Sequence, residues 1–230
     1  MVRNNVWNLG AGGIQALWKE VQRIVRVQLG LHEEANIEVE VAYIWASMEC
    51  TTFSPMDAMQ TESCRVWKGK HRGEPDRTTD KGRAAAQADK CMQGVLKFIS
   101  WAVKKFGAEW SIENPHGTLR QQRYMQTEEM GRLGLRFRLH KANWCVWRHL
   151  YCKLSDVWTS IQVWEPSGST GTGRCGHDCG MGREVEGDFN HFWAIGQESF
   201  RLYRGLDKDE VKMMVPGGLH EEMIQCRWPI

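Results

Sequence analysis

The sequence predicts an α/β fold, and three features of the middle of the chain support that prediction. Residues 39–47 (VEVAYIWAS) are dense in β-branched and aromatic side chains, which is typical of a buried strand. A long helical pattern follows, and a second apolar run at 108–112 comes directly after it. Because two strands joined by a crossover helix are almost always parallel, we expect one α/β domain built on a mostly parallel sheet.

The N-terminal part has the pattern of a strand, a glycine turn and a helix. Residues 6–9 lead into the glycine-rich residues 10–13, and residues 14–21 have a helical pattern. A glycine turn at such a place lets backbone amides approach a nucleotide-like ligand. Residues 24–31 are the candidate for a second strand.

The clearest helix of the chain begins at Thr79 or Asp80, either of which can cap it, and ends at Gly107. Its apolar residues recur at steps of three or four, which is the period of a helix with one buried face. They are Ala84, Ala88, Cys91, Val95, Ile99 and Val103. Two polar, glycine-containing stretches, 61–81 and 167–188, are predicted to be long surface loops.

Cys50 follows the first predicted strand, and Glu113 follows the second. Functional residues of such sheets lie just past the carboxyl ends of the strands, so we expect this thiol and this carboxylate to face a common cleft. A cysteine is a strong nucleophile as the thiolate, provided that a partner stabilises the adduct that it forms. The plainer interpretation of Cys50 is a small buried residue at a strand end.

The composition is that of a globular chain and narrows the class of protein. The 230 residues are 42% hydrophobic and 25% charged, with a net charge of +2. No apolar run approaches the roughly 18 residues of a membrane span, and the first residues lack the apolar stretch of a secretory signal. The eight cysteines are scattered, so we expect reduced thiols in an intracellular protein rather than a disulfide framework.

Several segments carry a resemblance to a known family. Residues 45–54 (WASMECTTFS) surround Cys50, residues 113–115 (ENP) follow the second strand, and residues 8–13 (NLGAGG) form the glycine turn. These segments are similar to the catalytic loop, the Glu-Asn motif and the S-adenosylmethionine loop of cytosine-5 DNA methyltransferases, particularly the small phage-type branch. Residues 148–159 resemble the segment with the later arginine motif of that family, and residues 216–224 resemble its final helix.

The resemblance implies a doubly wound, Rossmann-like S-adenosylmethionine methyltransferase fold. Too few residues separate Gly13 from Tyr43 for two further strand–helix units, so the fold is expected to be shortened at its N-terminal side. We expect residues 1–166 to form the methyltransferase-like domain, residues 167–190 a glycine-rich loop insertion, and residues 191–230 a segment that packs back on the same domain.

The resemblance also implies a covalent mechanism on a cytosine that has left the DNA stack. In that mechanism Cys50 attacks C6 of the ring, Glu113 hydrogen-bonds the N3 edge, and a methyl group from S-adenosylmethionine goes to C5. The implied catalytic residues are Cys50, Glu113, Asn114 and Arg148, and the implied cofactor-binding residues are Asn8, Gly10, Gly12 and Gly13.

Basic residues with interleaved aromatic residues suggest a nucleic-acid surface. Residues 131–155 contain several arginines and lysines, several aromatic residues and no acidic residue before position 156. Such a composition suits a phosphate backbone with stacked or extruded bases, although a solvated strand pair with a buried apolar face explains it equally well. The candidate nucleic-acid contacts are Lys68, Lys70, Arg72, Arg120, Arg136 and Arg138.

The segment 173–180 (GRCGHDCG) has a composition that zinc sites also show. Structural zinc takes four ligands, whereas Cys175, His177 and Cys179 are three, with only His191 nearby as a fourth. We therefore favour a glycine-rich loop whose cysteines pack locally, with no metal, over a zinc site. Trp45 and Trp158, on predicted strands, are expected in the core.

Two functions remain open at the level of the sequence. The first is a DNA cytosine-5 methyltransferase, with RNA as a weaker alternative substrate. The second is a catalytically inactive protein of the same fold that serves as a structural or binding subunit of a larger assembly. The second is motivated by the shortened N-terminal half and by Glu49, which stands where the family has a proline and puts an anion beside the thiol of Cys50.

Overall fold

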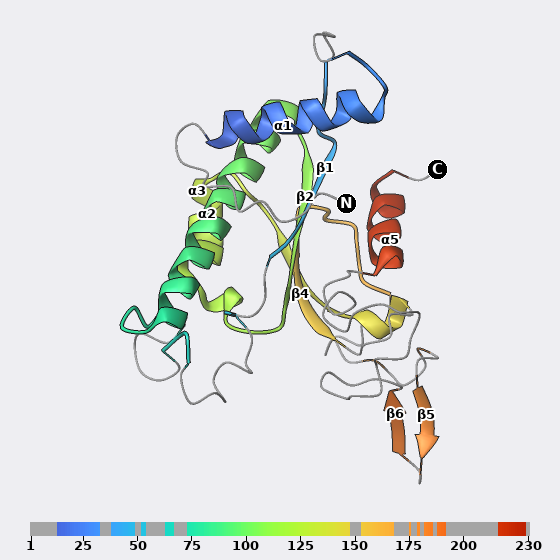
Figure 1. The fold of residues 1–230 in the computed structure, drawn as a ribbon. Coiled ribbons are helices and arrows are strands. Elements are labelled where there is room, and N and C mark those ends of the chain that lie inside the picture. Colours follow the sequence, from blue (N-terminus) through green and yellow to red (C-terminus); the bar gives the residue numbers. More distant parts are fainter. Residues whose placement is uncertain are drawn as a thin grey trace.

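The computed structural model describes residues 13–32, 38–48, 52–53, 63–66, 73–147, 153–167, 175, 179, 182–185, 188–191 and 216–228 of the chain. These residues form a mixed α/β structure around a four-stranded sheet, with α2 on one face of the sheet and α5 on the other (Figure 1). The predicted α/β class is therefore confirmed. None of the described helices is long and apolar enough to cross a membrane.

The strands of the central sheet are β1 (Tyr43–Ser47), β2 (Glu109–Pro115), β3 (Arg138–Asn143) and β4 (Leu154–Thr159). A separate antiparallel hairpin consists of β5 (Gly182–Val185) and β6 (Asp188–His191). The α-helices are α1 (Gly13–Gln28), α2 (Asp80–Phe106), α3 (Thr127–Arg132) and α5 (Gly217–Arg227), and three short 3-10 helices are η2 (Leu119–Gln121), η3 (Arg123–Met125) and η4 (Trp144–Trp147).

The predicted strand–helix–strand unit is present. β1 and β2 are adjacent and parallel, with Tyr43 opposite Glu109 and Ser47 opposite Glu113, and α2 lies between them in the chain. The parallel arrangement follows from the long crossover, which carries the chain back to the edge of the sheet where β1 began.

The rest of the central sheet differs from the expectation of mostly parallel strands. The strand order is β1-β2-β4-β3, and β4 is antiparallel to both β2 and β3. Among the described strands of the central sheet, one pair is therefore parallel and two pairs are antiparallel. The connection from β3 to β4 is shorter than the dozen or more residues that a parallel crossover takes, so this pair is a hairpin.

Two predicted boundaries are wrong. The second strand does not break at Glu113, because residues 113–115 pair with residues 155–157 of β4 and extend β2 to Pro115. Residues 24–31 are not a strand, because α1 continues to Gln28. The helix then ends in a Schellman motif at Gly30, which has φ 65°, with the Leu31 amide donating to the Arg26 carbonyl.

The predicted caps of α2 are confirmed. The Thr79 hydroxyl accepts a hydrogen bond from the Gly82 amide, and Gly107 ends the helix with φ 68° and an amide that donates to the Val103 carbonyl. The face of α2 that is fully buried differs by about one residue from the predicted apolar face, since Ala85 is buried and Ala84 is exposed.

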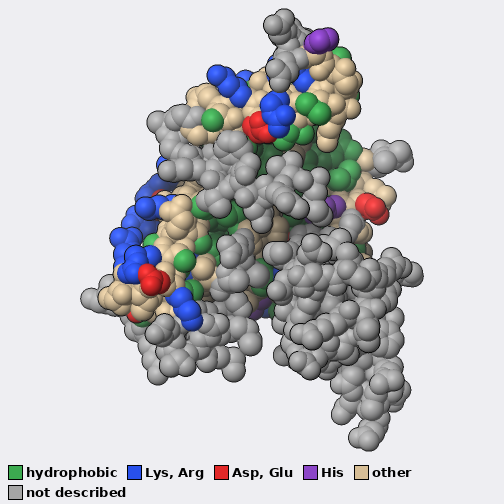
Figure 2. All heavy atoms as spheres, in the orientation of Figure 1, with side chains coloured by type: hydrophobic (Ala, Val, Ile, Leu, Met, Phe, Trp, Pro, Cys, Tyr) green, Lys and Arg blue, Asp and Glu red, His purple; other side chains and the backbone are tan. Residues whose placement is uncertain are grey.

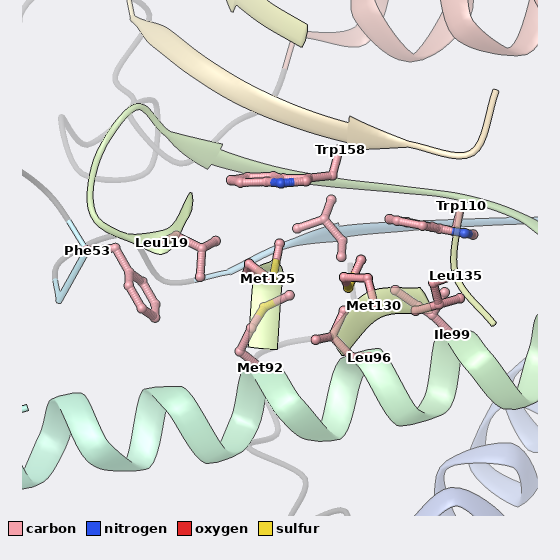
Figure 3. Close-up of a cluster of buried hydrophobic side chains, with 11 residues drawn as sticks. Phe53, Met92, Leu96, Ile99, Trp110, Leu119, Met125, Met130, Leu135 and Trp158 are labelled. Atoms are coloured by element: carbon pink, nitrogen blue, oxygen red, sulfur yellow. The ribbon is translucent and has the colours of Figure 1, made fainter. Parts of the chain in front are cut away.

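Two apolar clusters hold the sheet between its helices. The first cluster joins the α2 face of the sheet to α2, where Met92, Leu96 and Ile99 point toward Trp110 and Trp158 (Figure 3). The second cluster joins the opposite face to Leu219 and Met223 of α5. Trp158 lies in the core as predicted, whereas Trp45 is only half-buried and packs at the margin of the second cluster.

Candidate functional site

Glu113 is the central residue of the candidate site. It lies on β2 directly opposite Ser47, the last residue of β1, and its side chain is fully buried. The Ser47 hydroxyl donates to Oε2 of Glu113 at 2.6 Å, and the Ser155 hydroxyl of β4 donates to Oε1. Both carboxylate oxygens are therefore held by hydroxyl groups from the two flanking strands, which orients the carboxylate.

Lys153 brings a positive charge to the same carboxylate. Its Nζ lies 3.7 Å from Oε1 of Glu113 and 3.7 Å from the centre of the Trp144 ring. A buried carboxylate is costly unless it is paired and hydrogen-bonded, and here the lysine and the two hydroxyls meet that requirement. The sequence did not indicate that Lys153 contacts Glu113, because this contact depends on how β4 pairs with β2.

Asn114 ties the end of β1 to β2 on the other face of the sheet. Its Nδ2 donates to the Met48 carbonyl at 3.3 Å, one residue after β1 ends. Its Oδ1 is buried and has no hydrogen-bond partner among the residues described. An acceptor buried without a partner is rare in folded proteins and marks a place where another donor can bind.

Phe53 is held by hydrogen bonds to the segment that follows β2. The Phe53 carbonyl accepts hydrogen bonds from the Thr118 amide at 2.9 Å and from the Thr118 hydroxyl at 3.2 Å, and the Phe53 ring is fully buried. Thr118 lies in the segment that follows β2. Met48 and Phe53, the described residues that come before and after Cys50 in the chain, are thus hydrogen-bonded to β2 or to the segment after it.

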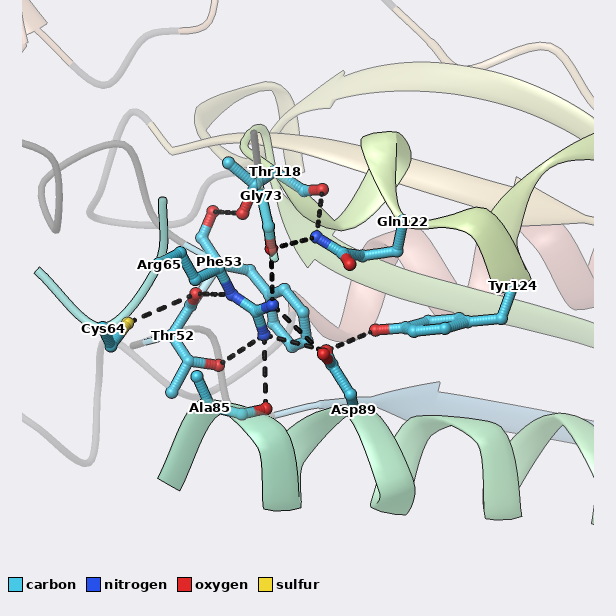
Figure 4. Close-up of polar contacts among 10 residues, drawn as sticks. All are labelled: Thr52, Phe53, Cys64, Arg65, Gly73, Ala85, Asp89, Thr118, Gln122 and Tyr124. Carbon is cyan, nitrogen blue, oxygen red and sulfur yellow. Dashed lines mark hydrogen bonds and ion pairs between the residues drawn. The ribbon is translucent and has the colours of Figure 1, made fainter. Parts of the chain in front are cut away.

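Arg65 contacts the neighbouring residue, Thr52, and links it to α2 (Figure 4). Its guanidinium group is buried, donates to the carbonyls of Thr52 and Gly73, and forms an ion pair of 2.9 Å with Asp89 of α2. The Tyr124 hydroxyl also donates to Asp89, and burial together with the charge of Asp89 raises the pKa of Tyr124 above its ordinary value. This network connects α2 with the segment after Cys50.

A histidine–aspartate pair lies near the same edge of the sheet. Nδ1 of His116, one residue after β2, lies 2.7 Å from Oδ1 of Asp156, which is buried on β4 opposite Asn114. The other carboxylate oxygen of Asp156 is buried without a hydrogen-bond partner in the described structure. Sequence reasoning did not single out this pair, because only the antiparallel register of β4 brings Asp156 beside the segment after β2.

The predicted site residues divide into those that the structure describes and those that it does not. Glu113 and Asn114 lie at the carboxyl end of β2, next to the end of β1. Several predicted residues lie outside the described part of the chain: Asn8, Gly10, Gly12, Cys50, Lys68, Lys70, Arg72 and Arg148.

The remaining predicted nucleic-acid contacts are exposed but do not gather around Glu113. Arg138 pairs with Glu165 at 2.8 Å and lies opposite Thr159, which in turn lies opposite Ser111, two residues before Glu113 on β2. Arg120 lies in η2, and Arg136 precedes β3. The ion pair with Glu165 offsets part of the charge of Arg138.

A different basic surface lies on α2 (Figure 2). Lysine and arginine side chains gather on the solvent side of this helix, and a helix that presents many like charges suits a phosphate backbone. The signal in the sequence is the helical period, which places these basic residues on the side of the helix away from its apolar face. The exposed basic residues of α2 are Lys81, Arg83, Lys90, Lys97, Lys104 and Lys105.

Of the residues expected to bind S-adenosylmethionine, Gly13 alone is described. It is the first residue of α1, and that helix packs through Trp18 against Trp101 and Phe106 near the end of α2.

Comparison of the chain with models of known protein families, with curated proteins and with solved structures finds no match. The geometry at the end of β1 and β2 is thus the basis on which a function can be argued.

Proposed function

We propose that the chain is a cytosine-5 methyltransferase-like protein that acts on DNA through a covalent adduct of Cys50. The observation that carries the proposal is the hydrogen bond between Ser47, which leads into the Cys50 loop, and the buried carboxylate of Glu113. It supports the juxtaposition of a cysteine loop and an oriented carboxylate that this chemistry uses.

The sheet supports a finer assignment of the fold. Many doubly wound sheets carry a reversed strand near one edge of an otherwise parallel sheet. The parallel pair β1–β2 is followed in space by the reversed strand β4 and then by β3, which runs in the direction of β1 and β2; this order is compatible with the C-terminal half of such a sheet. We infer a Rossmann-like methyltransferase fold, shortened on the N-terminal side, in which further strands lie beyond β1.

In the proposed reaction the thiolate of Cys50 forms a bond to C6 of cytosine, and the electron pair of the C5–C6 double bond moves toward C5. N3 takes up a proton from solvent as the adduct forms, and the Glu113 carboxylate accepts a hydrogen bond from this N3–H, which stabilises the electron-rich adduct. Ser47, Ser155 and Lys153 hold the carboxylate in place for that contact. Once C5 has received a methyl group, loss of the C5 proton expels the Cys50 thiolate and restores the double bond.

S-adenosylmethionine, when bound, supplies the methyl group that C5 receives. The resemblance assigns its binding to residues 8–13, and Arg148 is assigned to steady the base. A cytosine inside a duplex must leave the stack before Cys50 can reach C6, at a cost of a few kcal/mol. The exposed basic residues of α2, with Arg120 and Arg136, are the proposed contacts to the DNA backbone.

The test uses a DNA duplex that contains 5-fluorocytosine, together with S-adenosylmethionine. Fluorine at C5 cannot leave as a proton does, so the adduct with Cys50 persists and its mass can be measured. We expect the wild type and the exposed control Cys226→Ser to form the adduct, and Cys50→Ser to form none. An adduct that survives in Cys50→Ser would overturn the proposed mechanism.

Glu113 is tested with the corresponding unfluorinated duplex. Glu113→Gln keeps the shape but removes the charge, and we expect methyl transfer to ordinary DNA to fall by roughly 100-fold or more. Glu109→Gln, at the other end of β2, is the matched control and should retain most of the activity. Equal loss in both variants would show that the effect is structural.

The second candidate is an inactive protein of the same fold that serves as a subunit of a larger assembly. It is favoured by the complete burial of Glu113, whose two oxygens are already engaged by Ser47 and Ser155. Calorimetric titration with S-adenosylmethionine separates the two candidates. Binding in the micromolar range supports the enzyme, whereas a lack of heat together with no adduct on the fluorinated duplex supports the inactive subunit.

A further inference from the structure

Three cysteines from two distant parts of the chain converge at one place. Cys145 lies in η4, directly after β3, whereas Cys175 and Cys179 lie in the glycine-rich segment. The sulfur atoms of all three lie within 4.8 Å of one another. Cys145 and Cys175 are buried, and Cys179 is half-buried.

We propose that Cys145, Cys175 and Cys179 bind a structural zinc ion. Zinc in structural sites is tetrahedral, with Zn–S bonds of about 2.3 Å, which separates two bound sulfur atoms by about 3.8 Å. The observed separations, within 4.8 Å, reach that value with small changes of side-chain torsion. Cys175 and Cys179 are separated by three residues, a spacing that is common for a pair of zinc ligands in one loop.

Cys145 supplies a third sulfur atom, and this is the reason to propose zinc although the sequence alone favoured a loop without metal. The glycine-rich segment by itself offers too few ligands, and Cys145 belongs to a strand–helix junction of the central domain. Structural zinc sites commonly pair two ligands from one loop with ligands from a distant segment, because the ion then closes a long loop. Three thiolates are soft donors that favour zinc over magnesium or calcium.

The position of the cluster indicates what the ion does. η4 carries Trp147, whose indole nitrogen donates to Glu222 of α5 at 2.9 Å, so this junction is fastened to the domain. The hairpin of β5 and β6 begins shortly after Cys179. A zinc ion would therefore attach the hairpin-bearing segment to the junction, and the free energy of metal binding would stabilise that attachment.

The first experiment measures metal in the full-length protein purified with its thiols reduced. We expect close to one zinc per chain by mass spectrometry of the elements. Replacement by Co²⁺ should give the intense visible bands of tetrahedral cobalt and the near-ultraviolet bands of thiolate ligation. A chain that takes up neither metal when supplied with it, or that forms a disulfide between two of the three cysteines under the same conditions, would overturn the proposal.

Variants then assign the ligands. Cys175→Ser and Cys179→Ser should each lose the metal, whereas Cys226→Ser, exposed on α5, should keep it. The cobalt spectrum of the wild type counts thiolates without any substitution, which keeps the test decisive if Cys145→Ser fails to fold. Metal retained in both loop variants would contradict the proposal.

The fourth ligand is sought in the same way. His177→Ala and Cys152→Ser change two residues that lie outside the described part of the chain and carry suitable donor atoms. Loss of cobalt thiolate intensity in Cys152→Ser would indicate four sulfur ligands, and a change of the visible bands in His177→Ala alone would indicate three sulfurs and one nitrogen. The zinc site does not depend on the proposed methyl transfer, because metal content is measured without substrate.

Discussion

Glu113 is a buried carboxylate that the fold keeps at a considerable energetic cost. Moving a carboxylate out of water costs several kcal/mol, which Ser47, Ser155 and Lys153 offset by hydrogen bonds and charge. Hydrophobic residues of similar size would fill this position at least as stably. A carboxylate that is held by groups from two flanking strands is therefore more simply explained by function than by stability.

Arg65 has a structural role that can be measured. Removing one member of a buried ion pair leaves the other charged and without its partner, which costs about 3 kcal/mol or more. We expect Arg65→Met to lower the free energy of unfolding in urea by that amount, because Asp89 loses its partner. Arg83→Met, whose ion pair with Asp80 is exposed, is the control and should change stability by less than about 1 kcal/mol. Similar losses in both variants would refute the buried role of Arg65.

His220 is expected to make stability depend on pH. Burial lowers the pKa of His220 below its ordinary value near 6.5, and its ring packs on Trp45 with a centroid distance of 4.1 Å. The unfolded chain therefore takes up the proton at a higher pH than the folded chain, so the stability is complete above pH 6.5 and declines as the pH falls below it.

This prediction is checked by measuring the melting temperature at several pH values from about 7.5 to about 5, a range that spans the ordinary histidine pKa. We expect His220→Asn to show a smaller loss of melting temperature on acidification than the wild type. His140, whose pKa burial also lowers, accounts for part of the slope that remains. An unchanged slope in His220→Asn would show that other groups cause the pH dependence.

At the scale of elements, the start of α2 depends on a glycine. A Cβ atom added to Gly82 would lie 1.6 Å from the Asp76 carbonyl oxygen, which is backbone and cannot turn away. We expect Gly82→Ala to shift the first turn of α2 and to destabilise the fold by about 2 kcal/mol or more in urea unfolding. Gly131→Ala, in α3, meets no atom within 4 Å and should be neutral or stabilising, since alanine favours helix. Stability equal to the wild type in Gly82→Ala would show that the turn accommodates a side chain.

Glu222 is one of the residues that attach α5 to the rest of the protein. Glu222 accepts hydrogen bonds from the indole nitrogens of Trp147 and Trp164 and from the Ser167 amide, at 2.9 to 3.0 Å. Hydrogen bonds to charged groups contribute about 1.5 to 3 kcal/mol each, although the sum is smaller because they share one acceptor group. We expect Glu222→Ala to lower the unfolding free energy by about 2 kcal/mol and to speed hydrogen exchange in α5. Glu221→Ala, on the exposed side of the helix, is the control, and an equal effect there would contradict the attachment.

At the scale of the whole molecule, the sheet joins segments that lie far apart in the chain. β4 forms the centre of the described sheet, next to β2, and contributes Ser155 and Asp156 to the edge where Glu113 and His116 lie. α5 closes the opposite face with Leu219 and Met223. The candidate site therefore depends on the assembly of β1, β2 and β4 together, and not on a single motif.

Local features of the sequence were sufficient to predict part of this structure. The caps of α2 at Thr79 and Gly107 and the parallel pair on either side of it followed from residues that act within a few positions of one another. Gly30 is also a local signal, in this case for the end of α1. The strand predicted at residues 24–31 was wrong because that prediction rested on their apolar content and not on this glycine. The prediction that Glu113 comes after its strand was wrong because pairing with β4 extends β2.

The sequence by itself determined the caps and the helical period of α2 and the parallel pair of strands on either side of it. Only the tertiary structure decided that β4 lies antiparallel between β2 and β3, that Lys153 and Ser155 reach Glu113, and that Cys145 meets Cys175. The physical reason is the separation in sequence between the interacting residues. Helix capping and the amphipathic period depend on residues within one or two helical turns of each other. Strand order and side-chain contacts between distant segments depend instead on how all the apolar faces are buried together.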